Sequence, residues 1–155
     1  MRPPLIKTNL SDHKEDRLTE FVKELSRFDI VCLQEVFTTF NTRKQRLISY
    51  GAKSGLSWSV VSQEPSLFSG FLTDGGLLIM SRFPIVDSEF HPYPYGVLCD
   101  AISYKGVLYA KIMIGDKVLH LFNTHTQATY FGVHVDDFVR FILWIHDSPP
   151  SGSYL

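Results

Sequence analysis

The chain has 155 residues, of which 45% are hydrophobic, 14% aromatic and 20% charged. This composition excludes disordered, collagen-like and coiled-coil proteins, and the length suits one compact domain with its own core. Fifteen Lys and Arg residues against sixteen Asp and Glu residues give a net charge of −1. There is therefore no strong signal for nucleic-acid binding, and any phosphate chemistry has to come from a local site.

The sequence also bears on the cellular location of the protein and on the oxidation state of its two cysteines. Residues 1–6 carry no long apolar stretch that resembles a signal peptide, and no segment reaches the roughly 18 apolar residues that a membrane span needs. We therefore expect a cytoplasmic protein or a peripheral membrane protein. Cys32 and Cys99 are too few for a disulfide scaffold, so we expect both to be reduced thiols in the core.

The first part of the chain alternates between helical and strand patterns. A helix is predicted from Ser11, with Ser11 or Asp12 as its cap. Its apolar residues recur at helical spacing: Leu18, Phe21, Val22, Leu25 and Phe28. Residues 29–33 (DIVCL) are short, apolar and β-branched, which predicts a buried strand. A second helix over 41–52 and a strand over 57–62 follow, so the order of elements indicates an α/β protein.

Residues 63–74 are predicted to form a loop because they are rich in Pro, Ser and Gly. This loop nevertheless contains four large apolar residues: Leu67, Phe68, Phe71 and Leu72. Such side chains usually pack beneath their own loop. The alternative is a surface that touches a membrane or a partner protein.

Four strand patterns then follow in series: 75–80, 84–90, 106–114 and 117–124. Gly115 and Asp116 join the last two as a two-residue hairpin. Consecutive strands joined by hairpins indicate a mixed or antiparallel sheet rather than a doubly wound parallel one. Residues 135–145 are predicted to be a helix that is apolar nearly all round, which needs cover on most sides, and residues 147–152 begin a polar tail.

A carboxylate directly follows the first predicted strand, in the sequence Leu33-Gln34-Glu35-Val36. Sheets of α/β proteins bind ligands and metals at the carboxyl ends of their central strands. Mg²⁺ often takes only one or two protein carboxylates and keeps several waters. Glu35 is therefore a candidate metal ligand, and a solvated glutamate at a strand end is the ordinary alternative.

The last predicted strand ends in the small and polar residues 123–127 (NTHTQ). A histidine in this position can protonate a leaving group or donate to a phosphoryl oxygen, and Asn123 can help to position it. Of the six histidines only His125 has this setting, since His120 fits the strand pattern and the others lie outside any polar cluster. The spacing typical of a zinc site and the Gly-x-Ser-x-Gly motif of serine hydrolases are both absent from the sequence.

A third polar segment, residues 100–106 (DAISYKG), leads into the strand predicted at 106–114. Lys105 stands just ahead of that strand, where it can bind a phosphate, and a surface ion pair with Asp100 is the ordinary alternative. Gly75 and Gly76 lack both the spacing of a phosphate-binding loop and a following helix. They are therefore predicted to serve the backbone geometry at the start of a strand.

Together these segments resemble the motifs of the endonuclease/exonuclease/phosphatase superfamily, in the order in which they occur there. Residues 29–36 (DIVCLQEV) are similar to its first metal-site motif. Residues 75–85 (GGLLIMSRFPI) are similar to its central strand pair, and residues 123–125 (NTH) to its catalytic-histidine strand. Residues 105–107 (KGV) and 124–128 (THTQA) are most similar to the neutral sphingomyelinase branch.

The resemblance implies a four-layer α/β sandwich, in which two mixed or antiparallel sheets pack face to face with helices outside. It implies that Glu35 binds Mg²⁺ and that His125 stabilises or protonates the phosphoryl transition state. Asp100, Lys105 and Asn123 are the implied substrate-binding residues. The implied activity is Mg²⁺-dependent hydrolysis of sphingomyelin to ceramide and phosphocholine, a sphingolipid reaction at a membrane surface.

The sequence departs from the family at both ends. Residues 1–4 correspond to the segment just after a family strand that supplies a metal-binding Asn, and no such Asn precedes them. After Ala128 there is no Asp-x-Asn motif and no Asp-His pair, which supplies the general base in the family. We therefore expect a partial catalytic domain over 1–128, truncated at both ends, a divergent apolar helix and polar tail over 129–155, and no activity from the chain as it stands.

Two other functions fit the same residues. A catalytically dead, truncated product could bind a membrane or a partner protein, because the apolar helix predicted at 135–145 would have lost its cover. A nuclease or phosphatase of the same superfamily is the second alternative. The nuclease is disfavoured by the near-neutral charge and by the THTQA sequence at 124–128. The sequence gives no signal for the oligomeric state.

Overall fold

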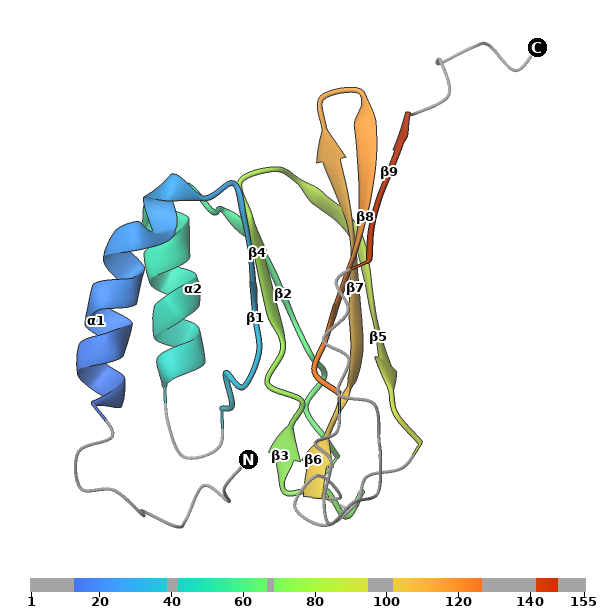
Figure 1. Ribbon diagram of the computed structural model, residues 1–155. Helices are drawn as coiled ribbons and strands as arrows, with labels where there is room; N and C mark the ends of the chain where they lie inside the picture. Colours follow the sequence, from blue (N-terminus) through green and yellow to red (C-terminus); the bar gives the residue numbers. More distant parts are fainter. Residues whose placement is uncertain (1–12, 39–41, 67–68, 95–101, 127–141, 148–155) are drawn as a thin grey trace, which may run out of the picture.

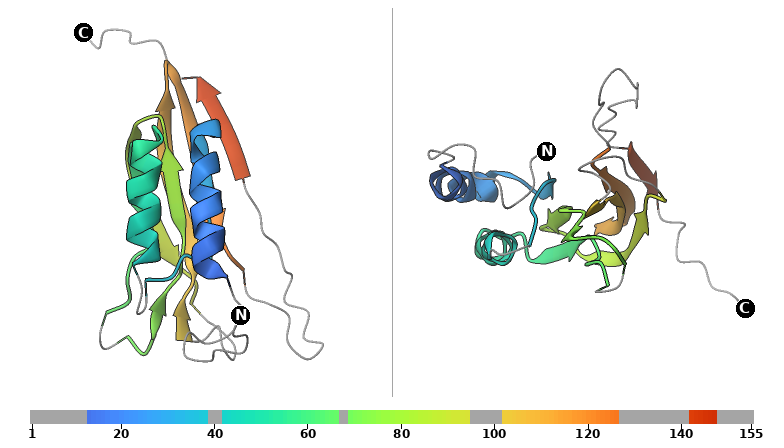
Figure 2. Two further views of the ribbon diagram at one scale, coloured as in Figure 1. Left: turned by 90° about the vertical axis from the view of Figure 1, so that its left-hand side faces the viewer. Right: turned by 90° about the horizontal axis from the view of Figure 1, so that it is seen from below.

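The computed structural model describes residues 13–38, 42–66, 69–94, 102–126 and, for the backbone, 142–147. These residues form three layers: two helices, a three-stranded sheet and a four-stranded sheet (Figure 1). Figure 2 shows the two helices side by side on one face of the three-stranded sheet, whose other face packs against the four-stranded sheet. The predicted α/β class with antiparallel sheets is confirmed.

The helical layer consists of α1 (Lys14–Glu24), the short 3₁₀ helix η1 (Leu25–Arg27) and α2 (Arg43–Lys53). One core lies between these helices and the three-stranded sheet. Its buried members come from both layers: Leu18, Leu25, Val31, Leu47, Leu56, Leu78 and Met80. Phe28 was predicted to join this apolar stripe, but its side chain is exposed, because the helical backbone ends at Arg27 and Phe28 is extended.

The three-stranded sheet contains β1 (Ile30–Leu33), β4 (Leu78–Ser81) and β2 (Trp58–Val61) in the order β1-β4-β2. Both outer strands pair antiparallel with β4. Every residue of β4 is buried, whereas β1 forms an edge of the described sheet. Among the described strands, the strand before Glu35 is thus an edge strand, whereas the sequence pattern suggested a central one. The carboxylate nevertheless follows a strand end.

The four-stranded sheet contains β5 (Ile85–Pro92), β7 (Gly106–Ile114), β8 (Lys117–Thr124) and β9 (Ile142–Asp147), paired antiparallel in that order. Gly115 turns the predicted hairpin between β7 and β8 with a φ of +63°. A second core fills the space between the two sheets: Leu77, Ile79, Leu108, Ala110, Ile112, Leu119 and Leu121. The alternating burial of β7 and β8 places these residues on one face.

One prediction about this sheet region is wrong. Residues 142–147 form β9, so the helix predicted over 135–145 is wrong for 142–145. Ile142, Trp144 and Ile145 are residues that favour strands, and pairing with β8 gives that strand's outer edge hydrogen-bond partners. Residues 135–141 and the predicted cap at Ser11 or Asp12 lie outside the described residues.

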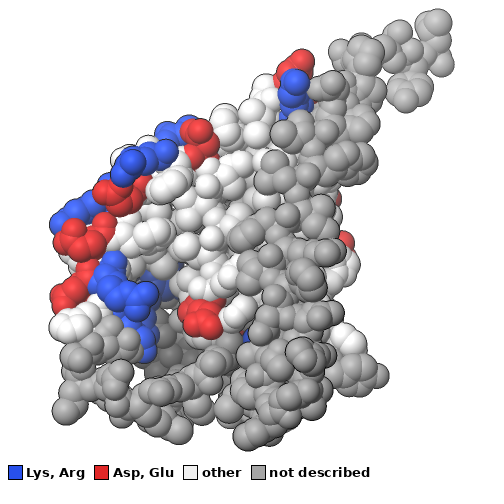
Figure 3. All heavy atoms as spheres, viewed as in Figure 1, with Lys and Arg blue, Asp and Glu red and all other residues white. Residues whose placement is uncertain are grey.

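Two short strands, β3 (Thr73–Asp74) and β6 (Ser103–Tyr104), form a parallel pair that the sequence pattern did not predict. On the face seen in Figure 3, charged side chains of both signs lie next to one another over the helices. Arg46 of α2, for example, pairs with Glu15 of α1. Within the described residues, no helix is long and apolar enough to cross a membrane.

Candidate active site

Glu35 and His125 meet at one end of the molecule. Glu35 follows β1 of the three-stranded sheet, and His125 follows β8 of the four-stranded sheet. Oε1 of Glu35 lies 3.7 Å from Nε2 of His125, with 53% of the glutamate side chain and 22% of the histidine side chain exposed. The two residues implied by the family resemblance are thus brought together from distant parts of the sequence. The carboxylate faces solvent, whereas the imidazole is largely covered.

Asn123 and Gln34 join the two sheets beside this pair. The fully buried amide of Asn123 donates to the carbonyl oxygens of Leu33 (3.0 Å) and Leu78 (3.3 Å). Gln34 donates in turn to Oδ1 of Asn123 (3.3 Å) and to the carbonyl oxygen of Thr124 (3.0 Å). Both polar groups of Asn123 are therefore engaged in fixing β8 against β1 and β4. The geometry gives Asn123 a positioning role behind the Glu35–His125 pair.

The backbone around Glu35 is unusual. Glu35 has a φ of +60°, in the left-handed region that non-glycine residues seldom occupy. The next amide, that of Val36, donates to the carbonyl oxygen of Gly76 (2.9 Å). Gly76 is itself left-handed, and a Cβ there would lie 2.9 Å from the Phe37 ring. The prediction that the paired glycines serve backbone geometry is therefore confirmed, and this close approach fixes the backbone just after Glu35, beyond the end of β1 at Leu33.

Lys105 lies close to His125 and is buried. Its ammonium group donates to the carbonyl oxygen of Thr126 (3.0 Å), one residue beyond His125. Thr124 on the other side of the histidine is held by the hydroxyl of Tyr93 (2.5 Å) and donates to the carbonyl oxygen of Gly106 (3.0 Å). The segment that carries His125 is thus fixed on both sides. Asp100, the remaining predicted site residue, lies outside the described residues.

Sequence reasoning missed a buried ion pair beside the site. Lys44 of α2 and Asp74 of β3 form a salt bridge in which both side chains are almost completely buried. Asp74 also accepts a hydrogen bond from the backbone amide of Thr38 (3.3 Å), shortly after Glu35. A lysine in the polar pattern of a helix and an aspartate at the end of a loop gave no sign that they would meet inside the protein.

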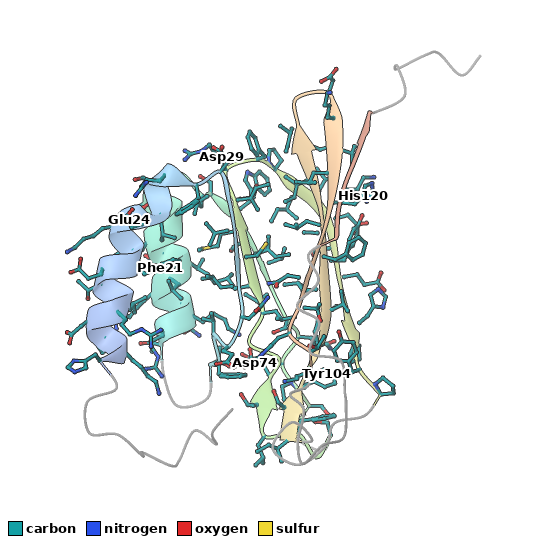
Figure 4. All side chains as sticks on the ribbon, in the orientation of Figure 1. Phe21, Glu24, Asp29, Asp74, Tyr104 and His120 are labelled. Atoms are coloured by element: carbon teal, nitrogen blue, oxygen red, sulfur yellow. The ribbon has the colours of Figure 1, made fainter. Side chains whose placement is uncertain are left out.

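Among its described residues, the predicted loop over 63–74 contributes one exposed large apolar side chain, that of Leu72. Phe71 packs against the ring of Tyr104, with ring centroids 4.9 Å apart, as expected of a residue that packs beneath its own loop. Leu72 is 69% exposed instead, although its amide donates to Ile102 (2.8 Å). Leu67 and Phe68 lie outside the described residues. Figure 4 shows Tyr104 and Asp74 at the same end of the molecule.

The family resemblance implies a Mg²⁺ ion, which requires side chains placed to bind it. In the described part of the chain, no group of three or more His, Cys, Asp and Glu side chains is placed to hold a metal ion. The exposed carboxylate of Glu35 is the hard oxygen donor that Mg²⁺ prefers, and Mg²⁺ accepts a single protein carboxylate completed by water or substrate oxygens. The described residues thus fit one protein ligand of a magnesium ion and not a closed metal cage.

Comparison with known proteins agrees with the geometry. Residues 8–151 match the Endonuclease/Exonuclease/phosphatase family. A sphingomyelinase of Dictyostelium discoideum is 43% identical over 115 residues, which cover 68% of this chain and 25% of that protein. Sphingomyelinase C of Listeria ivanovii is 30% identical over 127 residues, which cover 75% of this chain and 36% of that protein. The chain thus spans only a minor part of the length of these relatives.

Solved protein structures with a fold similar to that of this chain were also found. The crystal structure of SmcL matches with a TM-score of 0.67 and 28% identity, covering 79% of this chain and 44% of that one. A beta toxin of Staphylococcus aureus with bound magnesium ions matches with a TM-score of 0.60 and 25% identity, covering 72% and 43%. The family match, the sphingomyelinase relatives and the shared fold lead to one conclusion: the chain belongs to the Endonuclease/Exonuclease/phosphatase family and is of the sphingomyelinase type.

Proposed function

We propose that the chain carries a metal-binding carboxylate and the phosphate-facing histidine of a Mg²⁺-dependent phosphodiesterase, which in complete form hydrolyses sphingomyelin to ceramide and phosphocholine. The observation that carries the proposal is the approach of Glu35 to His125 at the ends of strands from two different sheets. The sphingomyelinase relatives support the substrate class. The magnesium ions of the related beta toxin support the metal.

The roles follow from the chemistry of each side chain. A bound Mg²⁺ would polarise the phosphoryl oxygens of the substrate. Glu35 would hold this ion through its solvent-facing carboxylate. Nε2 of His125 would hold or donate a proton at a phosphoryl or leaving-group oxygen. Gln34 and Asn123 would keep the two strands, and so the two side chains, in register.

Asp100, Lys105 and Asn123 remain proposed substrate-binding residues, and Asn123 also holds β8 against β1 and β4. A substrate phosphate that reaches Lys105 would share its ammonium group with the carbonyl oxygen of Thr126. Because an ammonium group has three donors, it can bind both at once. Lys105 would then couple phosphate binding to the position of the neighbouring His125.

The 155-residue chain by itself should not turn over substrate. After Ala128 the sequence has neither the Asp-x-Asn motif nor the Asp-His pair that the family resemblance requires. Losing a general base alone commonly costs a factor of about 10²–10⁴ in rate. We therefore expect no phosphocholine release above background from this chain, whereas the protein extended by any sequence that its gene encodes on either side should be active.

The test compares the chain with the extended protein on a panel of substrates. Sphingomyelin vesicles, phosphatidylcholine vesicles, plasmid DNA and inositol phosphates are each incubated with Mg²⁺ or with EDTA. The proposal predicts Mg²⁺-dependent phosphocholine release from sphingomyelin by the extended protein alone. Turnover by the chain itself would contradict the predicted inactivity.

The remaining outcomes separate the alternatives. Cleavage of DNA without hydrolysis of sphingomyelin would identify a nuclease, and phosphate release from inositol phosphates a phosphatase of the same family. An extended protein that binds sphingomyelin vesicles, with EDTA or with Mg²⁺, and hydrolyses none of the four substrates would identify a catalytically dead membrane-binding module. Each of these three results would overturn the sphingomyelinase proposal.

A further inference from the structure

A buried charge pair lies beside the segment that carries Glu35. Lys44 at the start of α2 is 4% exposed, and the side chain of Asp74 in β3 is inaccessible to solvent. The ammonium group of Lys44 donates to Oδ2 of Asp74. Moving two charges out of water is costly, and apolar residues of similar volume often replace such pairs without loss of stability. Stability alone therefore does not account for a charged pair at this place.

The contacts of Asp74 point to the backbone that follows Glu35. Oδ1 of Asp74 accepts the amide of Thr38 (3.3 Å), three residues after the glutamate. Gly76, two residues after Asp74, accepts the amide of Val36 (2.9 Å). The stretch from Val36 to Thr38 is thus hydrogen-bonded to residues 74–76 at both of its ends.

The position of Asp74 is fixed independently of the Glu35 segment. Its backbone carbonyl accepts the hydroxyl of Ser103 (3.2 Å), and β3 pairs with β6. Lys44 donates to Oδ2, and Oδ1 accepts the Thr38 amide (3.3 Å) together with the hydroxyl of the neighbouring Thr73 (3.4 Å). The carboxylate therefore acts as a fixed acceptor for a segment whose first residue, Glu35, has a left-handed backbone. Such a conformation persists only where the surroundings hold it.

We propose that Lys44 and Asp74 are positioning residues for Glu35: the neutralised Asp74 carboxylate anchors the Thr38 amide and so holds the Glu35 carboxylate where it binds a divalent cation. Lys44 acts by pairing with the buried Asp74 carboxylate and orienting it, and neither residue touches the metal. The inference rests on the proposed metal-binding role of Glu35. It adds that metal affinity depends on an ion pair outside the metal site.

Two double variants separate the effect of the acceptor oxygen at residue 74 from the effect of the buried charges. Lys44→Met/Asp74→Asn removes both charges and keeps an acceptor oxygen for Thr38, whereas Lys44→Met/Asp74→Leu removes the charges and the acceptor. Neither leaves an unpaired buried charge, so both variants are expected to fold. Lys44→Met/Asp74→Ala serves as a second variant without an acceptor. Asp29→Asn/Arg82→Gln is the matched control, because this ion pair (3.0 Å) lies at the other end of β1 (Figure 4).

The readout is metal binding rather than activity. Mn²⁺ is titrated into the ¹⁵N-labelled chain, and the midpoint is taken from the paramagnetic broadening of the Val36 and Thr38 amide signals. Thermal unfolding of each variant is measured in parallel. We expect the leucine or alanine double variant to raise the midpoint about tenfold, as losses of residues that orient metal ligands commonly do. The asparagine double variant and the Asp29/Arg82 control should stay near the original midpoint.

The variant Glu35→Gln distinguishes a failure of the proposed metal-binding role of Glu35 from a failure of the positioning role of Lys44 and Asp74. If Glu35→Gln leaves the midpoint unchanged, the metal role of Glu35 is wrong, and the positioning role falls with it. If Glu35→Gln raises the midpoint but the variants without an acceptor do not, the proposed function stands and the positioning inference is wrong. An equal rise in the Asp29/Arg82 control would also overturn the inference, because it would trace the effect to lower stability.

Discussion

The buried thiol of Cys32 makes the stability of the protein fall as the pH rises through the alkaline range. Its side chain lies in β1, and burial raises the pKa of the thiol from 9.0 to about 11. The folded state thus favours the protonated thiol, so this contribution to stability is complete below pH 9 and is lost as the pH rises towards 11. We predict that the free energy of unfolding falls by about 2 kcal/mol between pH 8 and pH 10.5 through this residue.

Urea unfolding of the wild type and Cys32→Val at both pH values measures this effect. The valine variant should lose less stability than the wild type between the two values. Part of the decline should remain, because burial also raises the pKa of Tyr109, with a smaller contribution from Asp87. Equal declines in both proteins would show that the thiol does not titrate as described.

The candidate site could be predicted from the sequence only in part, as its residues Glu35, His125 and Asn123 show. Polar residues directly after apolar strands indicated a site at both places, and the family resemblance implied the roles of Glu35 and His125. The engagement of Asn123 with carbonyl groups of β1 and β4 was not predictable. It depends on the packing of two sheets, and no local pattern specifies which strands will face one another.

The contact between the Glu35 segment and the residues just before β4 depends on Gly76. This residue is left-handed, and a Cβ would collide with Phe37 and with the Cα atom of Glu35 (3.1 Å). Gly115 has a similar φ, +63°, but no atom lies within 4 Å of its Cβ position. Gly115→Ala should therefore cost only the left-handed backbone strain, about 1–2 kcal/mol, and Gly76→Ala should cost clearly more.

Chemical denaturation of the two alanine variants gives the comparison directly. Because the backbone strain is nearly the same, the difference between them isolates the crowding around Gly76. The Gly76→Ala variant should also weaken Mn²⁺ binding, since its Cβ displaces the Glu35 segment. Equal stability losses would show that the contact between residue 76 and the Glu35 segment relaxes without cost.

Among the elements, the sequence predicted those with strong local patterns. The hairpin of β7 and β8 followed from alternation and from Gly115, and both long strands lie where they were expected. The pair β3 and β6 was missed because strands of two residues have no period. β9 was mistaken for a helix because short apolar runs fit either element. The pairing with β8 that makes 142–147 a strand is a tertiary contact.

At the scale of the whole molecule, the described residues place an exposed apolar side chain, that of Leu72, directly before β3, which carries Asp74. Leu72 precedes β3 and follows Phe71, which packs on Tyr104. If sphingomyelin is the substrate, this end of the protein must approach a membrane surface. We predict that Leu72→Ser weakens binding to sphingomyelin vesicles about tenfold, because inserting a leucine side chain contributes roughly 1.5–3 kcal/mol.

Vesicle sedimentation of the extended protein measures this binding. Val86→Ser is the matched control, since Val86 is also exposed but lies near the start of β5, where its neighbour Ile85 pairs with Ile112. Binding by the control should equal that of the wild type. A similar loss in both variants would indicate a general effect of surface hydrophobicity, and no loss in Leu72→Ser would exclude this loop from the membrane contact.

The fold of the whole molecule explains how the two proposed active-site side chains can come from separate sheets. The face-to-face packing brings the ends of β1 and β8 together, so the proposed action of Glu35 and His125 on one phosphoryl group requires both sheets to be in place. His120 and Glu89 supply matched controls for a test of this pair. His120 lies on the outer side of the four-stranded sheet in Figure 4 and bonds to Tyr109 (2.8 Å), and Glu89 lies exposed on β5.

The most direct measurement is the rate of phosphocholine release from sphingomyelin vesicles by the extended protein and its site variants. We expect Glu35→Gln and His125→Ala each to lower this rate by about 10²–10⁴ at saturating Mg²⁺. The double variant should lose little more than the worse single variant, because the two residues act as one unit. His120→Ala and Glu89→Gln should stay near the wild-type rate. Full activity in either Glu35→Gln or His125→Ala would contradict the assignment of the active site.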